Sequence, residues 1–449
     1  MTLVRAVVFT ILATTIARAA DRPNIIFIIT DDQRWDCLGC AGHPFLKTPN
    51  IDRLAKEGAY FENAFVTLPL CSPARAAFLT GKYNHTNQII ANTAAMGPIS
   101  HQLDTWAIHL QKAGYDTAGI GKFHMGVDDS PRPGWSHWAV FKGQGIYNNC
   151  PFNVDGTQTP TKGYVTDRIT DFAVDFIQKD HGDKPFAMWV GHKAVHGPYQ
   201  PADRHKDLYA DEPLPKREGV KDVDNVGKPA LTRKVAPPPV GHPAYGVTDD
   251  IIRDQLRCIV AVDEGVGRIL QALEVKNQLE NTLVIFTSDN GYFWNEHHLG
   301  DKRAAYEESI RVPMVMRFPK LIKAGTRVKE MVLNVDIAPT FTDLAKAEPI
   351  AGAHGRSLVP LLSGDASRWR ESALFEYFFE KPYPNIETWH AVRTADWKYI
   401  HHDNLEGMDE LYHLSADPNE MKNVIHDQAA AEKLAALRTE LTTLREATK

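Results

Sequence analysis

Oxygen-bearing polar side chains follow two apolar runs that are predicted to be strands. The run IIFIIT is followed at once by Asp31 and Asp32, and the run LVIFT is followed, one serine later, by Asp289 and Asn290. Carboxylate and amide oxygens without paired histidine or cysteine nearby suit Ca²⁺ or Mg²⁺ better than Zn²⁺. A single acidic pair is better explained by helix capping or strand termination, but two acidic strand ends in one sheet favour a metal site.

The stretch LCSPARAAFLTGKY places Cys71 at the start of a predicted helix, with Arg75 one turn later. Ser72 is expected to cap this helix and Pro73 to occupy its first turn. Cys71 would then lie at the positive end of the helix, where anions bind, and the Arg75 guanidinium could hold a sulfate- or phosphate-like group. A thiol phosphatase is the poorer interpretation, because its loop needs an arginine six residues after the cysteine and position 77 is alanine.

Further basic side chains could complete an anion site. Lys122 and His124 are two residues apart, so they project to the same side of an extended segment. His192 and His196 share a loop after the apolar run FAMWV, and Lys302 lies in the segment LGDKRAAYEES. Each alone is explained as a solvated lysine or a structural histidine. Together, beside a metal and an arginine-bearing helix, they predict a pocket for a tetrahedral anion with acid and base groups in reach.

These distant residues need a scaffold that brings them to one place. Four short apolar runs each deliver polar residues beyond their carboxyl ends, with helical stretches such as 105–113 and 253–273 between them. The four runs are residues 25–30, 115–120, 186–190 and 283–287. This pattern predicts the α/β class, with a sheet whose functional site lies at one edge.

After about residue 345 the sequence changes character. Short strand-like runs precede an amphipathic terminal helix, at residues 376–379, 390–393, 397–401, 410–414 and 429–445. They predict a smaller antiparallel subdomain over 346–449, after a catalytic domain over 22–345. Within the predicted catalytic domain, the stretch 211–243 is rich in proline and charge and is either a functional or a mobile loop.

The composition limits the possible partners. With 449 residues and 43% hydrophobic side chains the chain can bury a sizeable core. A net charge of −6 argues against a surface that wraps nucleic acid or another long polyanion, although a local basic pocket remains compatible with it.

The N-terminus predicts export. A short basic start, an apolar core over 6–17 and the small-x-small sequence Ala17-Arg18-Ala19 have the form of a signal peptide over 1–19. The core is too short to span a membrane, and no other apolar run approaches twenty residues. A periplasmic or secreted protein without a membrane span is therefore expected.

Five cysteines are an odd number for an oxidising compartment: Cys37, Cys40, Cys71, Cys150 and Cys258. Cys37 and Cys40 are spaced as C-x-x-C without a second pair at zinc-finger spacing, so they predict a small disulfide or two buried thiols. If Cys71 is excluded for chemical reasons, the other four could pair.

Several segments resemble one enzyme family. CSPAR followed by LTGKY matches the C-x-P-x-R signature of the type I sulfatases and its extension. RPNIIFIITDDQ, GIGKFHMG, FTSDNGY, DKRAAYEESIRVPMVMRFP and ELYHLSADPNEMKNV resemble the other blocks of that family, in the family's order. The resemblance implies an alkaline-phosphatase/sulfatase-like fold, in which helices flank a large mixed sheet and a smaller antiparallel sheet with a helix follows.

The resemblance also assigns expected roles. In this family the cysteine is oxidised to formylglycine by a dedicated maturation enzyme. One Ca²⁺ would be held by Asp31, Asp32, Asp289, Asn290 and an oxygen of the modified Cys71.

Arg75 would orient the formylglycine hydrate, and Lys122, His124, His196 and Lys302 would contact the sulfate ester. His196 precedes Gly-Pro and fits the family's H-x-P, which His192 does not.

The implied mechanism is covalent. One hydroxyl of the aldehyde hydrate attacks sulfur, and the alcohol leaves after protonation by His196 or Lys302. The second hydroxyl then loses its proton, with His124 as the expected acceptor, and sulfate is expelled.

The substrate expectation rests on TGKYNHTNQIIANT, GWSHWAV and the stretch from YNNCPFN to DFAVDFI, which look most like N-acetylglucosamine-6-sulfatases. The negative net charge favours exo action on chain ends or small oligosaccharides. Trp294, His297 and His298 could contact a sugar or could simply pack the loop.

Three alternatives remain at this stage. The chain could act on another sugar sulfate, of galactose, N-acetylgalactosamine, iduronate or an algal polysaccharide. It could be a phosphate or phosphonate ester hydrolase of the same superfamily, although LTGKY favours sulfate. A glycan-binding pseudosulfatase would be expected to lack parts of the charged constellation, and every position of it is filled.

Overall fold

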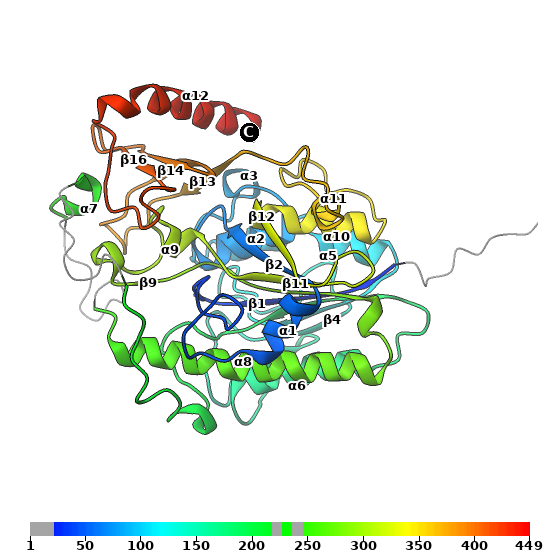
Figure 1. Cartoon of the computed structure of the whole chain (residues 1–449). Helices are drawn as coiled ribbons and strands as arrows, with labels where there is room; N and C mark the ends of the chain where they lie inside the picture. Colours follow the sequence, from blue (N-terminus) through cyan, green and yellow to red (C-terminus); the bar gives the residue numbers. More distant parts are fainter. Residues whose placement is uncertain (1–21, 218–226, 236–245) are drawn as a thin grey trace, which may run out of the picture.

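The computed structural model describes residues 22–217, 227–235 and 246–449 (Figure 1). A ten-stranded sheet lies between two layers of helices, and a four-stranded antiparallel sheet packs beside it. This arrangement confirms the predicted fold class, whereas the domain boundary at residue 345 stays a prediction. The predicted signal peptide and much of the loop 211–243 lie outside the described residues. Within those residues, no helix is both long and apolar enough to cross a membrane.

The large sheet is parallel at its centre. In spatial order its strands are β12 (Thr326–Leu333), β2 (Ala59–Phe65), β11 (Met314–Arg317), β8 (Thr282–Ser288), β1 (Asn24–Thr30), β7 (Phe186–Gly191), β3 (Asp116–Gly121), β4 (His137–Val140), β5 (Phe152–Val154) and β6 (Thr157–Thr159). The run from β8 to β4 is parallel throughout. The carboxyl ends of these five strands therefore meet at one edge.

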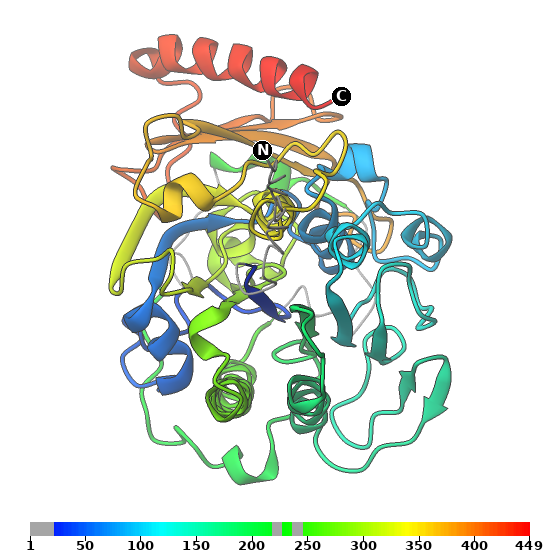
Figure 2. The ribbon, with the colours of Figure 1, turned by 90° about the vertical axis from the view of Figure 1, so that its right-hand side faces the viewer.

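Helices cover both faces of this sheet (Figures 1 and 2). One layer contains α1 (Pro49–Glu57), α6 (Val165–Gln178) and α8 (Asp249–Val275), and the other contains α2 (Cys71–Thr80), α5 (Trp106–Lys112) and α10 (Ile337–Leu344).

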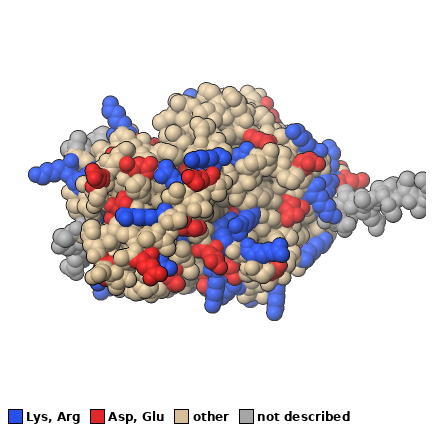
Figure 3. Space-filling view, turned by 90° about the horizontal axis from the view of Figure 1, so that it is seen from above, with Lys and Arg blue, Asp and Glu red and all other residues tan. Residues whose placement is uncertain are grey.

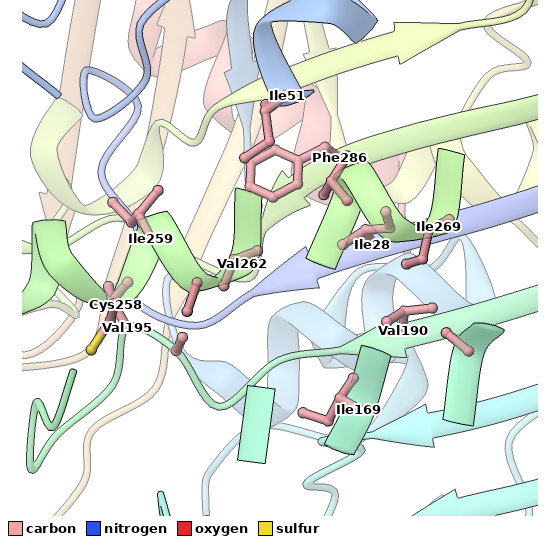
Figure 4. Close-up of a cluster of buried hydrophobic side chains, with 14 of the residues drawn as sticks. Ile28, Ile51, Ile169, Val190, Val195, Cys258, Ile259, Val262, Ile269 and Phe286 are labelled. Carbon is pink, nitrogen blue, oxygen red and sulfur yellow. The ribbon is translucent and has the colours of Figure 1, made fainter. Parts of the chain in front are cut away.

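Strand β1 shows why both layers are needed. All of its residues are buried, as expected for a parallel strand covered on two faces. Ile26 and Ile28 join the apolar cluster under α1, α6 and α8, part of which is drawn in Figure 4. Ile25, Phe27 and Ile29 alternate with them and pack toward α2, α5 and α10.

The C-terminal sheet is also covered on both faces. Its strands are β13 (Ser372–Tyr377), β14 (Trp389–Thr394), β15 (Trp397–His402) and β16 (Glu410–His413), followed by α12 (Ala431–Ala447). One face packs on α12 through Leu437 and Leu441. The other packs on the large domain through Phe375, Tyr377 and Trp389. The predicted first strand was placed too late, because the pairing of β13 with β14 begins at Ser372.

Helix α8 begins one turn earlier than the periodicity predicted. Its first two residues, Asp249 and Asp250, are acidic and exposed, so apolar spacing gives no signal for the helix start. The Thr248 side chain accepts a hydrogen bond from the Ile251 amide at 3.3 Å and caps the helix.

Charges of both signs are interspersed over the face that contains the C-terminal elements, as Figure 3 shows from above. This face therefore does not present one extended field of a single sign.

The N-terminus of α1 depends on a buried carboxylate from α8. Asp263 accepts hydrogen bonds from the backbone amides of Asn50 at 3.0 Å and Ile51 at 2.8 Å, and from the Asn50 side chain at 2.9 Å. Burial raises the pKa of Asp263 to about 6, so the group is largely a carboxylate at neutral pH.

Replacing Asp263 by alanine is expected to lower the free energy of unfolding by about 2 kcal/mol, because buried amides lose their acceptor. The midpoint of urea unfolding at pH 7 measures this. Asp175→Ala, at an exposed position of α6, is the control. Equal midpoints for the two variants would show that this cap contributes nothing.

Candidate active site

The carboxyl ends of the parallel strands bring together the residues predicted from sequence. Direct side-chain or backbone contacts link Asp31, Asp32, Cys71, Arg75, Lys122, His124, His196, Asp289, Asn290 and Lys302, in some cases through Ser72. Strand β1 supplies the two leading aspartates, β8 supplies Asp289 and Asn290, and β3 leads directly into Lys122. The strand order therefore assembles the site from segments more than 250 residues apart.

The acidic groups at the centre form a candidate metal site. One ligand atom from each of Asp31, Asp32, Cys71 and Asp289 lies within 4.8 Å of the others, and all four residues are buried. Donors surrounding one Ca²⁺ at about 2.4 Å can be at most about 4.8 Å apart, so this spacing fits a single ion. The Oδ1 atom of Asn290 is buried without a hydrogen-bond partner in the described part of the chain and is a further oxygen donor.

Mutual repulsion is visible at Asp32. Burial raises the pKa of this carboxyl to about 6 against the opposing charge of Lys302, and the charges of Asp289 and Asp301 contribute to the rise. The Asn290 amide nitrogen donates to Asp32 Oδ1 at 2.7 Å. Oxygen donors gathered out of water in this way are stabilised by a nearby cation.

Cys71 is the first residue of α2, and Pro73 lies in the first turn as predicted. The predicted cap is wrong: the flanking position is the extended Leu70, and the Ser72 hydroxyl instead donates to the backbone oxygen of His124. Ser72 therefore ties the start of α2 to the loop after β3.

The Cys71 thiol is fully buried, with Sγ 3.3 Å from both Asp31 Oδ1 and Lys302 Nζ. Burial raises the pKa of Cys71 to about 12, with Lys302 opposing this and Asp289 adding to it. Such a thiol is protonated at neutral pH and is a poor nucleophile. The geometry thus disfavours the thiol phosphatase alternative.

Arg75 is directed at carboxylate and backbone oxygens. Its Nε donates to Asp289 Oδ2 at 2.9 Å and its Nη1 to the backbone oxygen of Lys122 at 2.8 Å. The indole of Trp189 donates to the same backbone oxygen at 3.1 Å. Arg75 therefore fixes the start of α2 relative to the end of β8 and the loop after β3.

Two lysines bracket the acidic centre. Lys122 Nζ contacts Asp31, and Lys302 Nζ contacts Asp32 and Cys71. Both lysines are buried, so their charges require these carboxylates. Phe123 packs among core aromatic rings. Strand β3 ends at Gly121 and His124 has a left-handed backbone with φ 53°, so the extended segment predicted for Lys122 and His124 does not reach His124.

The three histidines singled out from the sequence all lie at or near the site, where His124 and His192 are buried and His196 is half-buried. His196 Nδ1 lies 2.9 Å from the backbone oxygen of Gly197, and its Nε2 lies 3.8 Å from Asp32. Burial and then the charge of Lys122 hold the pKa of both His124 and His196 well below the usual range. His192 is buried against the neighbouring structure, and burial lowers its pKa to about 3.

Other residues at the site were missed. Asp301 and Arg303 flank Lys302 and are almost fully buried. Arg303 also pairs with Glu380 at 2.8 Å, so the C-terminal subdomain reaches the border of the site. The charged tripeptide DKR was the available sequence signal for Asp301 and Arg303, whereas nothing in the sequence connects Glu380 to these two residues.

Gln144 and Lys193 were also missed. Lys122 Nζ donates to Gln144 Oε1 at 2.5 Å, and Lys193 Nζ donates to the backbone oxygens of Gln144 at 3.1 Å and Gly197 at 2.9 Å. Gln144 follows β4, a strand too short to stand out in the sequence.

Two of the three ring-bearing residues predicted to contact a sugar or pack the loop, Trp294 and His297, are buried in packing contacts. Trp294 is buried under Arg34, whose guanidinium lies 4.5 Å from the ring, and its indole donates to Gln255 at 2.5 Å. His297 is buried with its ring 4.2 Å from that of Tyr306. His298 is exposed.

The cysteines do not pair. All five lie in the described ranges and are free, so the suggested Cys37–Cys40 disulfide and the pairing of the remaining four are wrong. Cys37 lies 3.5 Å from a carboxylate oxygen of Asp36, and Cys258 accepts from Tyr164 at 3.8 Å. The alternative of buried thiols holds for Cys37, while Cys40 is partly exposed.

Comparisons with known proteins agree with this geometry. The family model Sulfatase matches residues 23–347, and the model N-sulphoglucosamine sulphohydrolase, C-terminal, matches residues 295–447. An N-acetylglucosamine-6-O-sulfatase of Bacteroides thetaiotaomicron is 34% identical over 475 aligned residues, which cover 92% of this chain and 84% of that protein.

Solved structures are similar over nearly the whole chain. A protein solved in complex with its substrate D-glucosamine-2-N,6-O-disulfate has a TM-score of 0.87 and 32% identity, covering 95% of this chain and 98% of its own. The phosphonate monoester hydrolase of Agrobacterium radiobacter has a TM-score of 0.77 and 25% identity, covering 95% and 96%. From the matched family model and these relatives, the chain belongs to the sulfatase family of enzymes.

Proposed function

We propose that this sulfatase depends on Ca²⁺ and formylglycine and removes the 6-O-sulfate of N-acetylglucosamine from glycans, acting on chain ends. The observation that carries the proposal is the buried Cys71 at the start of α2, held between the acidic centre and Lys302. A cysteine with a suppressed thiolate has little use as a thiol here, whereas an oxygen at the same position would face both a metal and a cation.

The donor set fits a hard divalent ion. Asp31, Asp32, Asp289 and Asn290 would hold Ca²⁺ together with an oxygen of residue 71. The ion would supply positive charge beside the sulfate oxygens. Lys122 and Lys302, which contact these carboxylates, would be freed in part to neutralise the sulfate itself.

Oxidation of Cys71 to formylglycine would supply a hydrated aldehyde as the oxygen nucleophile, and it requires a maturation enzyme as partner. Arg75 acts through Asp289 and the Lys122 backbone to fix the start of α2 relative to the carboxylates. This rigid support keeps residue 71 in place for attack on sulfur.

Acid and base roles follow from the hydrogen bonds. Lys302 Nζ lies 3.3 Å from Cys71 Sγ, so it lies beside the nucleophile and can neutralise negative charge that develops there. His196 donates through Nδ1 to Gly197, which leaves Nε2 as an acceptor beside Asp32. We therefore place Lys302 beside the nucleophile, and we propose His196 or His124 as the group that accepts the proton of the attacking hydroxyl.

The substrate is proposed from the description of a sequence relative and from the ligand of a solved structure. One is named for N-acetylglucosamine-6-O-sulfatase activity, and the other was solved with a 6-O-sulfated glucosamine. The likeness to a phosphonate monoester hydrolase keeps that chemistry as the second candidate. We further propose export to the periplasm or beyond and the division into 22–345 and 346–449, both on sequence alone.

Cys71→Ala is expected to lower sulfate release at least about 1000-fold, because the nucleophile is lost. The protein is coexpressed with a formylglycine-generating enzyme, and peptide mass measures conversion at position 71. Cys150→Ala, another buried cysteine, should retain activity. Wild-type activity without conversion would contradict the role of formylglycine.

Removal of Ca²⁺ with EGTA is expected to abolish activity and lower the melting temperature, and added Ca²⁺ should restore both. Asn290→Ala should weaken Ca²⁺ binding by at least about 10-fold, since even residues outside the first ligand sphere contribute that much. Thermal shift against Ca²⁺ concentration measures this. Asn404→Ala, at an exposed position, is the control. An unchanged Ca²⁺ response in Asn290→Ala would exclude Asn290 as a ligand.

The converted enzyme is expected to release sulfate selectively from N-acetylglucosamine 6-sulfate. The comparison set is galactose 6-sulfate, N-acetylgalactosamine 4- and 6-sulfates, an iduronate 2-sulfate disaccharide and N-acetylglucosamine 6-phosphate. Ion chromatography measures the released anion. Preference for another sulfate would contradict the sugar assignment alone, and faster release of phosphate would favour the second candidate.

A further inference from the structure

Gln144 occupies a position that none of the predicted site residues explains. It lies on a tight turn after β4, between Gly143 and Gly145, both of which have positive φ angles. A side chain at Gly145 would place its Cβ 2.6 Å from the Phe141 ring, so this turn requires glycine. The turn directs the half-buried Gln144 toward the ammonium of Lys122.

The orientation of the Gln144 amide is fixed by chemistry. Lys122 Nζ contacts Asp31 and donates to the Gln144 carbonyl oxygen at 2.5 Å, and a lysine ammonium has only donors to offer that oxygen. The Nε2 amide group, which has two N–H donors, therefore points away from Lys122. Among the described residues it has no hydrogen-bond partner, and its nitrogen is not sealed from solvent.

Lys193 holds this arrangement in place. Its buried ammonium bridges the backbone oxygens of Gln144 and Gly197 and lies 5.0 Å from the centre of the Tyr147 ring. The Tyr147 hydroxyl in turn donates to the backbone oxygen of His196 at 2.7 Å. The turn bearing Gln144 and the loop bearing His196 are thus fastened to each other.

We infer that Gln144 is a substrate-contacting residue, whose Nε2 amine donates a hydrogen bond to a sulfate oxygen while its carbonyl positions Lys122. The inference rests on the proposed function, because that proposal assigns Lys122 as a cation beside the sulfate. An anion next to Lys122 requires donors on its remaining sides, and the Gln144 amine is an unused donor adjacent to that ammonium. Lys193 is a positioning residue for this contact.

Two variants separate donation from positioning. Gln144→Met keeps the length of the side chain and removes both hydrogen-bonding groups. Gln144→Glu keeps an acceptor for Lys122 and removes the donor. Gln178→Met, at an exposed position at the end of α6, is the matched control. Melting temperatures establish that each variant is folded.

Activity is measured as kcat/KM on both N-acetylglucosamine 6-sulfate and 4-nitrophenyl sulfate. We expect Gln144→Met to lose about 10- to 100-fold on both esters, the range of a hydrogen bond to a charged group. Gln144→Glu should lose at least as much. A loss under about 2-fold, or one confined to the sugar ester, or full activity in Gln144→Glu, would each overturn the inference.

A binding measurement makes the outcome independent of the proposed activity. In a Cys71→Ala background, inorganic sulfate is titrated and the rise in melting temperature recorded. Gln144→Met should need about 10-fold more sulfate for the same rise, and Gln178→Met should match the parent. If the wild type releases no sulfate from any ester, the proposed function fails, while this titration still decides the role of Gln144.

Discussion

The site depends on like charges held together out of water. Three aspartates from the ends of β1 and β8 are fully or almost fully buried within reach of one another, an arrangement that is unstable by itself. It is stabilised by Arg75, Lys122 and Lys302, whose side chains arrive from three other segments. Because every cation also needs its carboxylate, neither set can be buried without the other.

The same compensation extends to the C-terminal subdomain. Glu307, shortly after Lys302, pairs with Arg393 and Lys398 at 2.9 Å each, and Lys398 also pairs with Glu420 at 2.7 Å. These buried pairs join α9 (Glu307–Ile310) to β14 and β15. With Arg303 and Glu380 they fix the segment that presents Lys302, so the smaller sheet supports the site although it contributes few groups to it.

Much of this could be predicted from sequence, because parallel strands leave a clear signal. Runs such as IIFIIT are apolar throughout, and the polar residues beyond their ends had to meet at one edge. The CSPAR and DKR segments added chemistry that spacing alone would not have identified. The start of α8 and the edge of β13 could not be predicted from spacing, because a hydrogen bond that the Thr248 side chain accepts and the pairing of β13 with β14 fix them.

What could not be predicted are contacts that depend on three-dimensional proximity alone. The Ser72 hydroxyl caps no helix because the His124 backbone oxygen lies within reach. Gln144 and Lys193 belong to no recognisable pattern, and only the neighbouring positions of β3, β4 and β7 bring them to Lys122.

The complete burial of α2 has a consequence for the order of events during biosynthesis. All ten of its residues are buried, and the Cys71 sulfur contacts the buried side chains of Asp31 and Lys302. If Cys71 is oxidised as proposed, the maturation enzyme would have to reach the sulfur before α2 docks. Once α2 has docked, a thiol that escaped oxidation would be sealed in, and the result would be a stably folded protein that stays inert.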